Sequence, residues 1–212
     1  MIPVYVVHLP NAERKAKIAA ELARVGLTKV KYIHAQEPVR GFQCSNMRRN
    51  PRGEFGCSLS HLKAIATAIE DHVYDALFIE DDIVFSPDCY WDAPETNIKL
   101  PPDWNVIYLG GHPRAPVKRF NDRLVKTGEW SFAESYLMHY QSMREFMKFW
   151  CDRAGQPNAM FDIILGEYAA QGGGYAFYPQ LTHQPIQYSY IGQKVDDKSG
   201  CINKGWTSNL AA

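Results

Sequence analysis

Cysteine is scarce in this chain and follows no regular spacing. Only five cysteines occur in 212 residues. Their odd number argues against a disulfide framework, and no Cys-x-x-Cys pair is present to indicate a structural zinc site. Free thiols of this kind are typical of a reducing compartment, so we expect a cytoplasmic protein.

An excess of one charge is also missing, as are long apolar runs, repeats and low-complexity segments. Acidic and basic residues number 23 each, so the whole protein has no bulk attraction for nucleic acid or anionic membrane. No apolar run reaches the roughly 18 residues of a transmembrane helix. A strand pattern begins directly after Met1, so we expect neither a signal peptide nor an integral membrane segment. The 46% of hydrophobic residues can supply the core of one compact domain.

The apolar pattern predicts strands and helices in alternation. The expected strands are 2–8, 30–34, 76–79, 106–109 and 175–178. The expected helices are one between Asn11 as N-cap and Gly26 as stop, one from about residue 57, one over 135–151 and one over 158–170. This order favours an α/β fold with a mostly parallel central sheet flanked by helices.

Three consecutive acids follow the central apolar strand. Residues 76–79 are apolar, Glu80, Asp81 and Asp82 come next, and the chain then turns apolar again. Because strand side chains alternate, we expect Glu80 and Asp82 on one face and Asp81 on the other. Carboxylates this close resist joint ionisation, and a Mg²⁺ or Mn²⁺ ion would remove the conflict. The alternative is a polar strand end with solvated acids.

A second polar segment lies in residues 53–62, at the predicted start of a helix. The apolar series of that helix is Leu59, Leu62, Ile65, Ala66 and Ile69. Its spacing predicts a start near Cys57 or Ser58, with Ser58 as N-cap. Ser60 and His61 would then lie in the first turn, where free backbone N–H groups attract phosphate. Alternatively, Ser60 only caps the helix and His61 only packs.

The two segments together resemble glycosyltransferase family 25, which includes bacterial lipopolysaccharide glycosyltransferases and collagen galactosyltransferases. GEFGCSLSHL (53–62) is similar to the family's helix start, and ALFIEDDIVF (76–85) to its strand ending in Glu-Asp-Asp. Weaker matches are VYVVHL (4–9) with Arg14, DWNVIYLGG (103–111) and PQLTHQPIQYSYI (179–191). The resemblance therefore covers about residues 2 to 191.

The resemblance implies a single GT-A-like (Rossmann-like) domain over residues 1–191, with 192–212 as a polar tail or lid. It implies transfer of a hexose from a nucleotide sugar, with a UDP-sugar as the first candidate donor, to a hydroxyl acceptor with inversion, using Mn²⁺ or Mg²⁺. Glu80 and Asp82 take the outer positions of the D-x-D element of GT-A glycosyltransferases, and His183 is a candidate third metal ligand. The candidate donor-binding residues are Leu9, Arg14, Ser60, His61, Gly110, Gly111 and Gln184.

Inversion by direct displacement needs one general base near the acceptor hydroxyl, usually a carboxylate. Asp162 is the first candidate and Glu134 the second. Asp162 is also a favourable helix N-terminal residue without any catalytic role. His112 follows the glycine pair and is a further candidate for donor or metal contact.

The sequence assigns no single role to two parts of the chain. The arginines Arg40, Arg48, Arg49 and Arg52 precede the signature helix, and are either a solvated face or contacts to an anionic acceptor or the diphosphate. Residues 113–130 match no part of the family pattern. The acceptor could be a glycan, lipopolysaccharide or, as for some phage enzymes, modified DNA. Clustered acids would also suit a metal-dependent phosphohydrolase, and a non-catalytic relative would bind nucleotide sugar without turnover.

Overall fold

The computed structural model describes residues 2–36, 51–87, 89, 100–154, 156, 160–185, 187–189, 194–196 and 210–211. Within these residues the chain builds a nine-stranded sheet in the order β15-β7-β8-β11-β5-β10-β3-β1-β2. The strands are β1 (Val4–His8), β2 (Val30–His34), β3 (Asp75–Glu80), β5 (Val106–Tyr108), β7 (Val117–Arg119), β8 (Leu124–Lys126), β10 (Ser135–His139), β11 (Gly174–Phe177) and β15 (Leu210–Ala211). β10 and β8 run antiparallel to their neighbours, and the other strands of this sheet share one direction. The predicted mostly parallel α/β sheet is confirmed.

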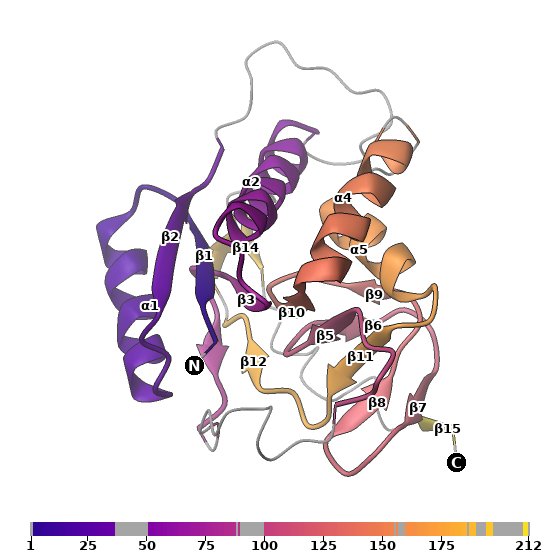
Figure 1. The fold of residues 1–212 in the computed structure, drawn as a ribbon. Helices are drawn as coiled ribbons and strands as arrows, with labels where there is room; N and C mark the ends of the chain where they lie inside the picture. Colours follow the sequence, from indigo (N-terminus) through magenta and orange to yellow (C-terminus); the bar gives the residue numbers. More distant parts are fainter. Residues whose placement is uncertain are drawn as a thin grey trace.

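Helices cover both faces of the sheet (Figure 1). The helices are α1 (Ala12–Arg24), α2 (Pro51–Glu70), α4 (Tyr140–Arg153) and α5 (Phe161–Ala169). On one face, Ile18 and Leu22 of α1 pack in the same core cluster as Val6 and Ile79. The other face carries α2, α4 and α5 in a second cluster that is rich in aromatic rings. None of the described helices is long and apolar enough to cross a membrane.

Three short pairings lie outside the main sheet in the described part of the chain. β4 (Val84–Phe85) pairs with β12 (Thr182–His183), and β6 (His112–Pro113) pairs with β9 (Trp130–Ser131). β13 (Gln187–Ser189) pairs with β14 (Lys194–Asp196). The unmatched segment 113–130 contains β7 and β8, which extend the sheet beyond β11. The boundary expected at residue 191 stays a prediction.

Helix α1 begins and ends where the sequence predicted. Asn11 is the N-cap, and its side chain accepts a hydrogen bond from the backbone N–H of Arg14 at 3.0 Å. Gly26 has φ +80°, which glycine adopts without the strain that a Cβ would cause. A polar cap, an amphipathic helix and a glycine stop are all local signals, and this is why they were visible in the sequence.

The helix predicted over 135–151 was wrong in its first turn. Ser135–His139 form β10, and α4 begins at Tyr140. The side chains of Tyr136, Leu137 and Met138 are 0–2% exposed because the strand lies between β3 and β5. A short buried strand has no apolar alternation, so the sequence pattern could not separate it from the helix. His139 caps α4 in a reciprocal capping box with Ser142.

The start of α2 was also placed wrongly. The helix begins at Pro51, so Ser58 is no N-cap, and Ser60 and His61 lie in the middle of the helix. Proline suits the first helical position. The Ser58 and Ser60 hydroxyls donate to the Glu54 and Gly56 carbonyls within the helix, at 2.9 and 2.6 Å. The prediction that Ser60 and His61 lie at a helix N-terminus and bind phosphate there is therefore wrong.

Candidate active site

The acids lie where the carboxyl ends of β1 and β3 meet. These strands are parallel neighbours, with Val7 opposite Glu80 in the register. The backbone N–H of Leu9, just past β1, donates to Asp81 Oδ2 at 3.0 Å. The loop after β1 and the acidic turn therefore meet at one edge of the sheet.

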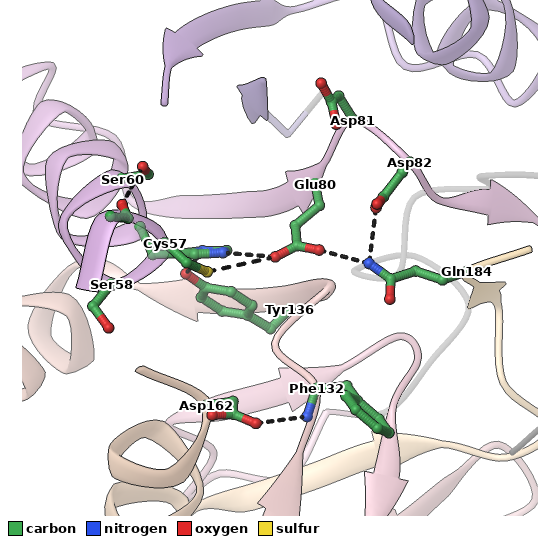
Figure 2. Close-up of polar contacts among 12 residues, drawn as sticks. Cys57, Ser58, Ser60, Glu80, Asp81, Asp82, Phe132, Tyr136, Asp162 and Gln184 are labelled. Atoms are coloured by element: carbon green, nitrogen blue, oxygen red, sulfur yellow. Dashed lines mark hydrogen bonds and ion pairs between the residues drawn. The ribbon is translucent and has the colours of Figure 1, made fainter. Parts of the chain in front are cut away.

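Glu80 and Asp82 converge on one partner, Gln184 (Figure 2). Gln184 Nε2 donates to Glu80 Oε2 at 2.6 Å and to Asp82 Oδ1 at 2.8 Å. Asp81 points the other way in the same view, although β3 already ends at Glu80 and the two aspartates lie in a turn. The two-and-one division expected from strand alternation therefore persists past the strand end.

Arg14 offsets the charge of the two aspartates. Its Nη2 lies 2.7 Å from Asp81 Oδ1 and 2.6 Å from Asp82 Oδ2. Burial raises the pKa of Asp81 to about 6, and the charges of Asp82 and Glu80 add to this rise, whereas Arg14 and the Leu9 N–H oppose it. The chain thus contributes its own cation to the acidic turn through α1, whose N-terminal turn carries Arg14.

The middle of α2 contacts Glu80 on the side opposite to Gln184. His61 Nε2 is 3.2 Å from Glu80 Oε1, and His61 Nδ1 is 3.1 Å from the Tyr136 hydroxyl. The His61 ring is fully buried and stacks on Phe161 with centroids 4.4 Å apart. Cys57 Sγ lies 3.9 Å from the same Glu80 oxygen. Cys57 and Tyr136 were not anticipated as site residues, although the four-residue spacing of Cys57 and His61 places both on one helix face.

Ser60 has a different neighbourhood. Its hydroxyl, 1% exposed, accepts a hydrogen bond from the backbone N–H of Gln36 at 2.8 Å. Together with the bond to Gly56, this contact ties the segment after β2 to α2. Ser60 therefore positions the loop at the sheet edge by a buried hydrogen bond.

Among the residues that the structure describes, two sets of ligand atoms suit a metal ion, and both contain Glu80. Glu80 Oε2 and Asp82 Oδ1 approach one nitrogen, so a small side-chain shift would let them share a cation with metal–oxygen distances of about 2.1 Å. The ligand atoms of Cys57, His61 and Glu80 lie within 4.8 Å of one another. His183 is not part of that second group. Burial lowers the pKa of His183, and the nearby charge of Glu21 opposes the fall, so this imidazole lies close to α1.

Gly110 and Gly111 pack closely against residues 130–134 and against Thr182 of β12. A Cβ on Gly110 would lie 2.5 Å from Thr182 Oγ1 and would also collide with Glu134 Oε1. Gly111 has φ +112°, and Trp130 Nε1 donates to the Gly110 carbonyl at 3.1 Å. The glycine pair thus allows a close approach of two backbone segments, and whether it also contacts a donor stays a prediction. Beyond it, the half-buried His112 has a buried Nδ1 without a hydrogen-bond partner among the described residues.

The two candidate bases lie on neighbouring segments after β9. Asp162, in the first turn of α5, accepts hydrogen bonds from the backbone N–H groups of Phe132 at 3.3 Å and Ile163 at 2.9 Å. Phe132 has φ +66°, so Asp162 stabilises a strained loop. Glu134 is 5% exposed, and its backbone carbonyl accepts from the Glu80 N–H at 2.9 Å. Figure 2 shows the Asp162–Phe132 contact well apart from the Glu80–Gln184 contact, with Tyr136 drawn between them.

The arginines Arg40, Arg48 and Arg49 lie outside the described residues, and for Arg52 the structure describes only the backbone at the start of α2. Their proposed contacts with an acceptor or diphosphate stay predictions.

A family model agrees with this arrangement of helix, strand and acids. The model of glycosyltransferase family 25, described as an LPS biosynthesis protein family, matches residues 1–154. The chain belongs to glycosyltransferase family 25. It is therefore an enzyme that transfers glycosyl groups, as the resemblance indicated.

Solved structures that this family 25 chain resembles include a glycosyltransferase involved in glycosylating the major capsid of PBCV-1. The identity to it is 12%, the TM-score is 0.47, and the match covers 77% of this chain and 72% of that one. A Bacillus anthracis protein provisionally assigned as a glucose-1-phosphate thymidylyltransferase matches at 14% identity and TM-score 0.45, over 83% of this chain and 86% of its own. No curated protein matches the family 25 chain.

Proposed function

We propose that this family 25 enzyme is a divalent-metal-dependent, inverting hexosyltransferase of the GT-A type that uses a nucleotide sugar, in the first instance a UDP-sugar. The observation that carries the proposal is the convergence of Glu80 Oε2 and Asp82 Oδ1 on one point at the end of β3. Two carboxylates in this position match the pair of oxygen ligands that Mg²⁺ and Mn²⁺ prefer.

Glu80 and Asp82 would hold the ion, with Gln184 withdrawing its N–H or turning its amide oxygen toward it. When bound, the ion supplies positive charge that stabilises the diphosphate leaving group. Arg14, paired with Asp81 and Asp82, keeps the acidic turn in place and adds positive charge at the same edge. Leu9 and His61 contact these acids directly, whereas Ser60, Gly110 and Gly111 support the donor site through buried packing.

The transfer itself is a single displacement. The base removes the proton of an acceptor hydroxyl as that oxygen bonds to the anomeric carbon, and the bond from that carbon to the phosphate oxygen breaks with its electron pair on the diphosphate. Asp162 is the first candidate for the base and Glu134 the second. Asp162 is carried by α5, which follows the central strands in the sequence, whereas Glu134 lies just before β10 and its backbone carbonyl accepts from the Glu80 N–H.

The decisive experiment is a panel of nucleotide sugars with and without Mn²⁺, followed by thermal unfolding and by release of nucleoside diphosphate. A matching donor should raise the melting temperature in the presence of Mn²⁺, because a ligand that binds the folded state stabilises it. Glycan and lipopolysaccharide acceptors, with glucosylated or hydroxymethylated DNA as a further arm, identify the acceptor class.

Asp82→Asn should abolish both the metal-dependent shift and the diphosphate release while the protein stays folded. Asp122→Asn is the matched control, because Asp122 is an exposed acid away from the acidic turn. Full activity in excess chelator would overturn the metal requirement. Release of inorganic phosphate from plain nucleotides without any acceptor would instead indicate a phosphohydrolase.

A further inference from the structure

The ligand group of Cys57, His61 and Glu80 contains a thiol and an imidazole, which the acidic turn lacks. We propose that Cys57, His61 and Glu80 form a Zn²⁺ site that shares Glu80 with the Glu80–Asp82 pair. Thiolate and imidazole are the ligands that zinc selects, whereas magnesium and manganese favour the all-oxygen pair. The two sites therefore differ in metal preference although they lie on either side of one carboxylate.

The distances suit tetrahedral zinc. Bonds of about 2.3 Å to sulfur and about 2.0 Å to nitrogen or oxygen place the nitrogen and oxygen ligands about 3.3 Å apart, and sulfur and oxygen about 3.5 Å apart. The structure has 3.2 Å between His61 Nε2 and Glu80 Oε1, and 3.9 Å between Cys57 Sγ and the same oxygen. Cys57 Sγ has to move a few tenths of an ångström toward Glu80 Oε1, and it lies within 4.8 Å of the His61 ligand nitrogen, so a side-chain adjustment would bring the three ligands around one ion.

The backbone already holds two of the ligands in position. Cys57 and His61 are four residues apart in α2, so their side chains lie one above the other on a single helix face. Glu80 is the last residue of β3, a central and almost fully buried strand. Ligands on rigid elements need little reorganisation on binding.

The surroundings of His61 are those of a metal ligand. The Tyr136 hydroxyl lies 3.1 Å from His61 Nδ1 and can accept a hydrogen bond from Nδ1–H, which leaves the Nε2 lone pair available to a metal ion beside Glu80. Phe161 stacks on the imidazole and holds its plane. Such a partner on the second ring nitrogen orients the ring and raises its basicity as a ligand.

A metal ion can also reach the group. Cys57 is half-buried and the Glu80 side chain is 24% exposed, whereas His61 closes the inner side. Three protein ligands leave one tetrahedral position for water or a substrate group. Because Glu80 would be engaged by zinc, occupancy of this site should weaken binding of the hard metal; this consequence, unlike the site itself, rests on the proposed function.

Co²⁺ is the probe for the site, since it takes the place of zinc and gives a thiolate-to-metal absorption in the near ultraviolet. We expect one equivalent of Co²⁺ to produce this band together with the visible bands of tetrahedral cobalt, and one equivalent of Zn²⁺ to remove them. Cys57→Ser should abolish the near-ultraviolet band, and His61→Gln should weaken Co²⁺ binding at least tenfold.

Two controls separate this site from other thiols and from the acidic turn. Cys151→Ser removes an exposed free cysteine and should keep the bands. Asp82→Asn should also keep them, although it disables the proposed hard-metal pair. Circular dichroism verifies that each variant is folded. If His61→Gln does not fold, the Cys57→Ser variant alone tests the site.

The band at full intensity in Cys57→Ser, or no band in the wild type with Co²⁺ in excess, would overturn the zinc site and leave Cys57 as a hydrogen-bond donor to Glu80. A second arm measures Zn²⁺ inhibition of Mn²⁺-dependent transfer, which should be at least tenfold weaker in Cys57→Ser than in Cys151→Ser. If no transfer is found at all, the proposed function fails while the cobalt spectrum still decides the zinc site.

Discussion

Gln184 donates a single amide nitrogen to both Glu80 and Asp82, at 2.6 and 2.8 Å. The residues are 104 and 102 positions apart in the sequence. This amide group adds a shared donor between two like charges, beside the contacts of Arg14 with Asp82 and of His61 with Glu80. A metal ion held by Glu80 and Asp82, as we propose, would compete with Gln184 for the same pair of oxygens.

Gln184→Leu tests this competition. Loss of the shared donor should lower the free energy of unfolding by about 1–3 kcal/mol, because two partly buried carboxylates each lose one hydrogen-bond donor. Mn²⁺ should restore this loss, so the metal-induced rise in melting temperature should be larger in the variant than in the wild type. Gln141→Leu, which removes an exposed amide that donates to Glu145, is the control. A smaller metal-induced rise would show that the Gln184 amide oxygen is itself a ligand.

Arg14→Ala tests the contribution of the Arg14 guanidinium group, which pairs with Asp81 and Asp82, to stability. Asp81, whose side chain is 4% exposed, would keep its Leu9 N–H but lose its opposite charge. Removing one partner of such a buried pair should cost about 3 kcal/mol in urea-induced unfolding at pH 7. Lys17→Ala is the matched control on the same helix, because its ion pair with Glu13 is solvated and should contribute little. Equal effects of the two variants would contradict the structural role of Arg14.

Gly110→Ala tests the close approach beside the acidic turn. The new methyl group would collide with Thr182 and Glu134, and overpacking of this kind should cost about 1–3 kcal/mol. A methyl group added at Gly128 would have its nearest neighbour 3.7 Å away, so Gly128→Ala should change the melting temperature little. If Gly110→Ala were as stable as the wild type but failed to bind donor, the glycine would serve the ligand and not the packing.

Asp162→Asn tests the general base. Turnover should fall by a factor of about 10² or more, as is typical when a general base is lost. Donor affinity should be nearly unchanged, because the base contacts the acceptor. The amide oxygen of asparagine can still accept one backbone N–H, so the loop at Phe132 should stay ordered, which proton exchange of that amide can verify.

Asp152→Asn, on the exposed side of α4, is the control for this substitution. Glu134→Gln is measured alongside it. Turnover of Asp162→Asn within a few-fold of the wild type, together with a large loss in Glu134→Gln, would transfer the role of base to Glu134.

Local signals predicted the parts of the fold that depend on neighbours in sequence. Asn11 and Gly26 marked both ends of α1 because a cap and a left-handed stop are decided within one turn. The run before Glu80 predicted a buried strand with three acids at its end, and the signature segments indicated the family that the family model then showed.

Tertiary structure decided which side chains those acids meet. Nothing local to Gln184 indicates that it bridges Glu80 and Asp82, because the contact depends on the path of the whole chain through β12. The same holds for Tyr136, which reaches His61 only because Ser135–His139 is inserted as a strand between β3 and β5. Sequence patterns record the local preferences of the backbone and the periodic burial of side chains, whereas a binding site is formed by distant segments that packing brings together.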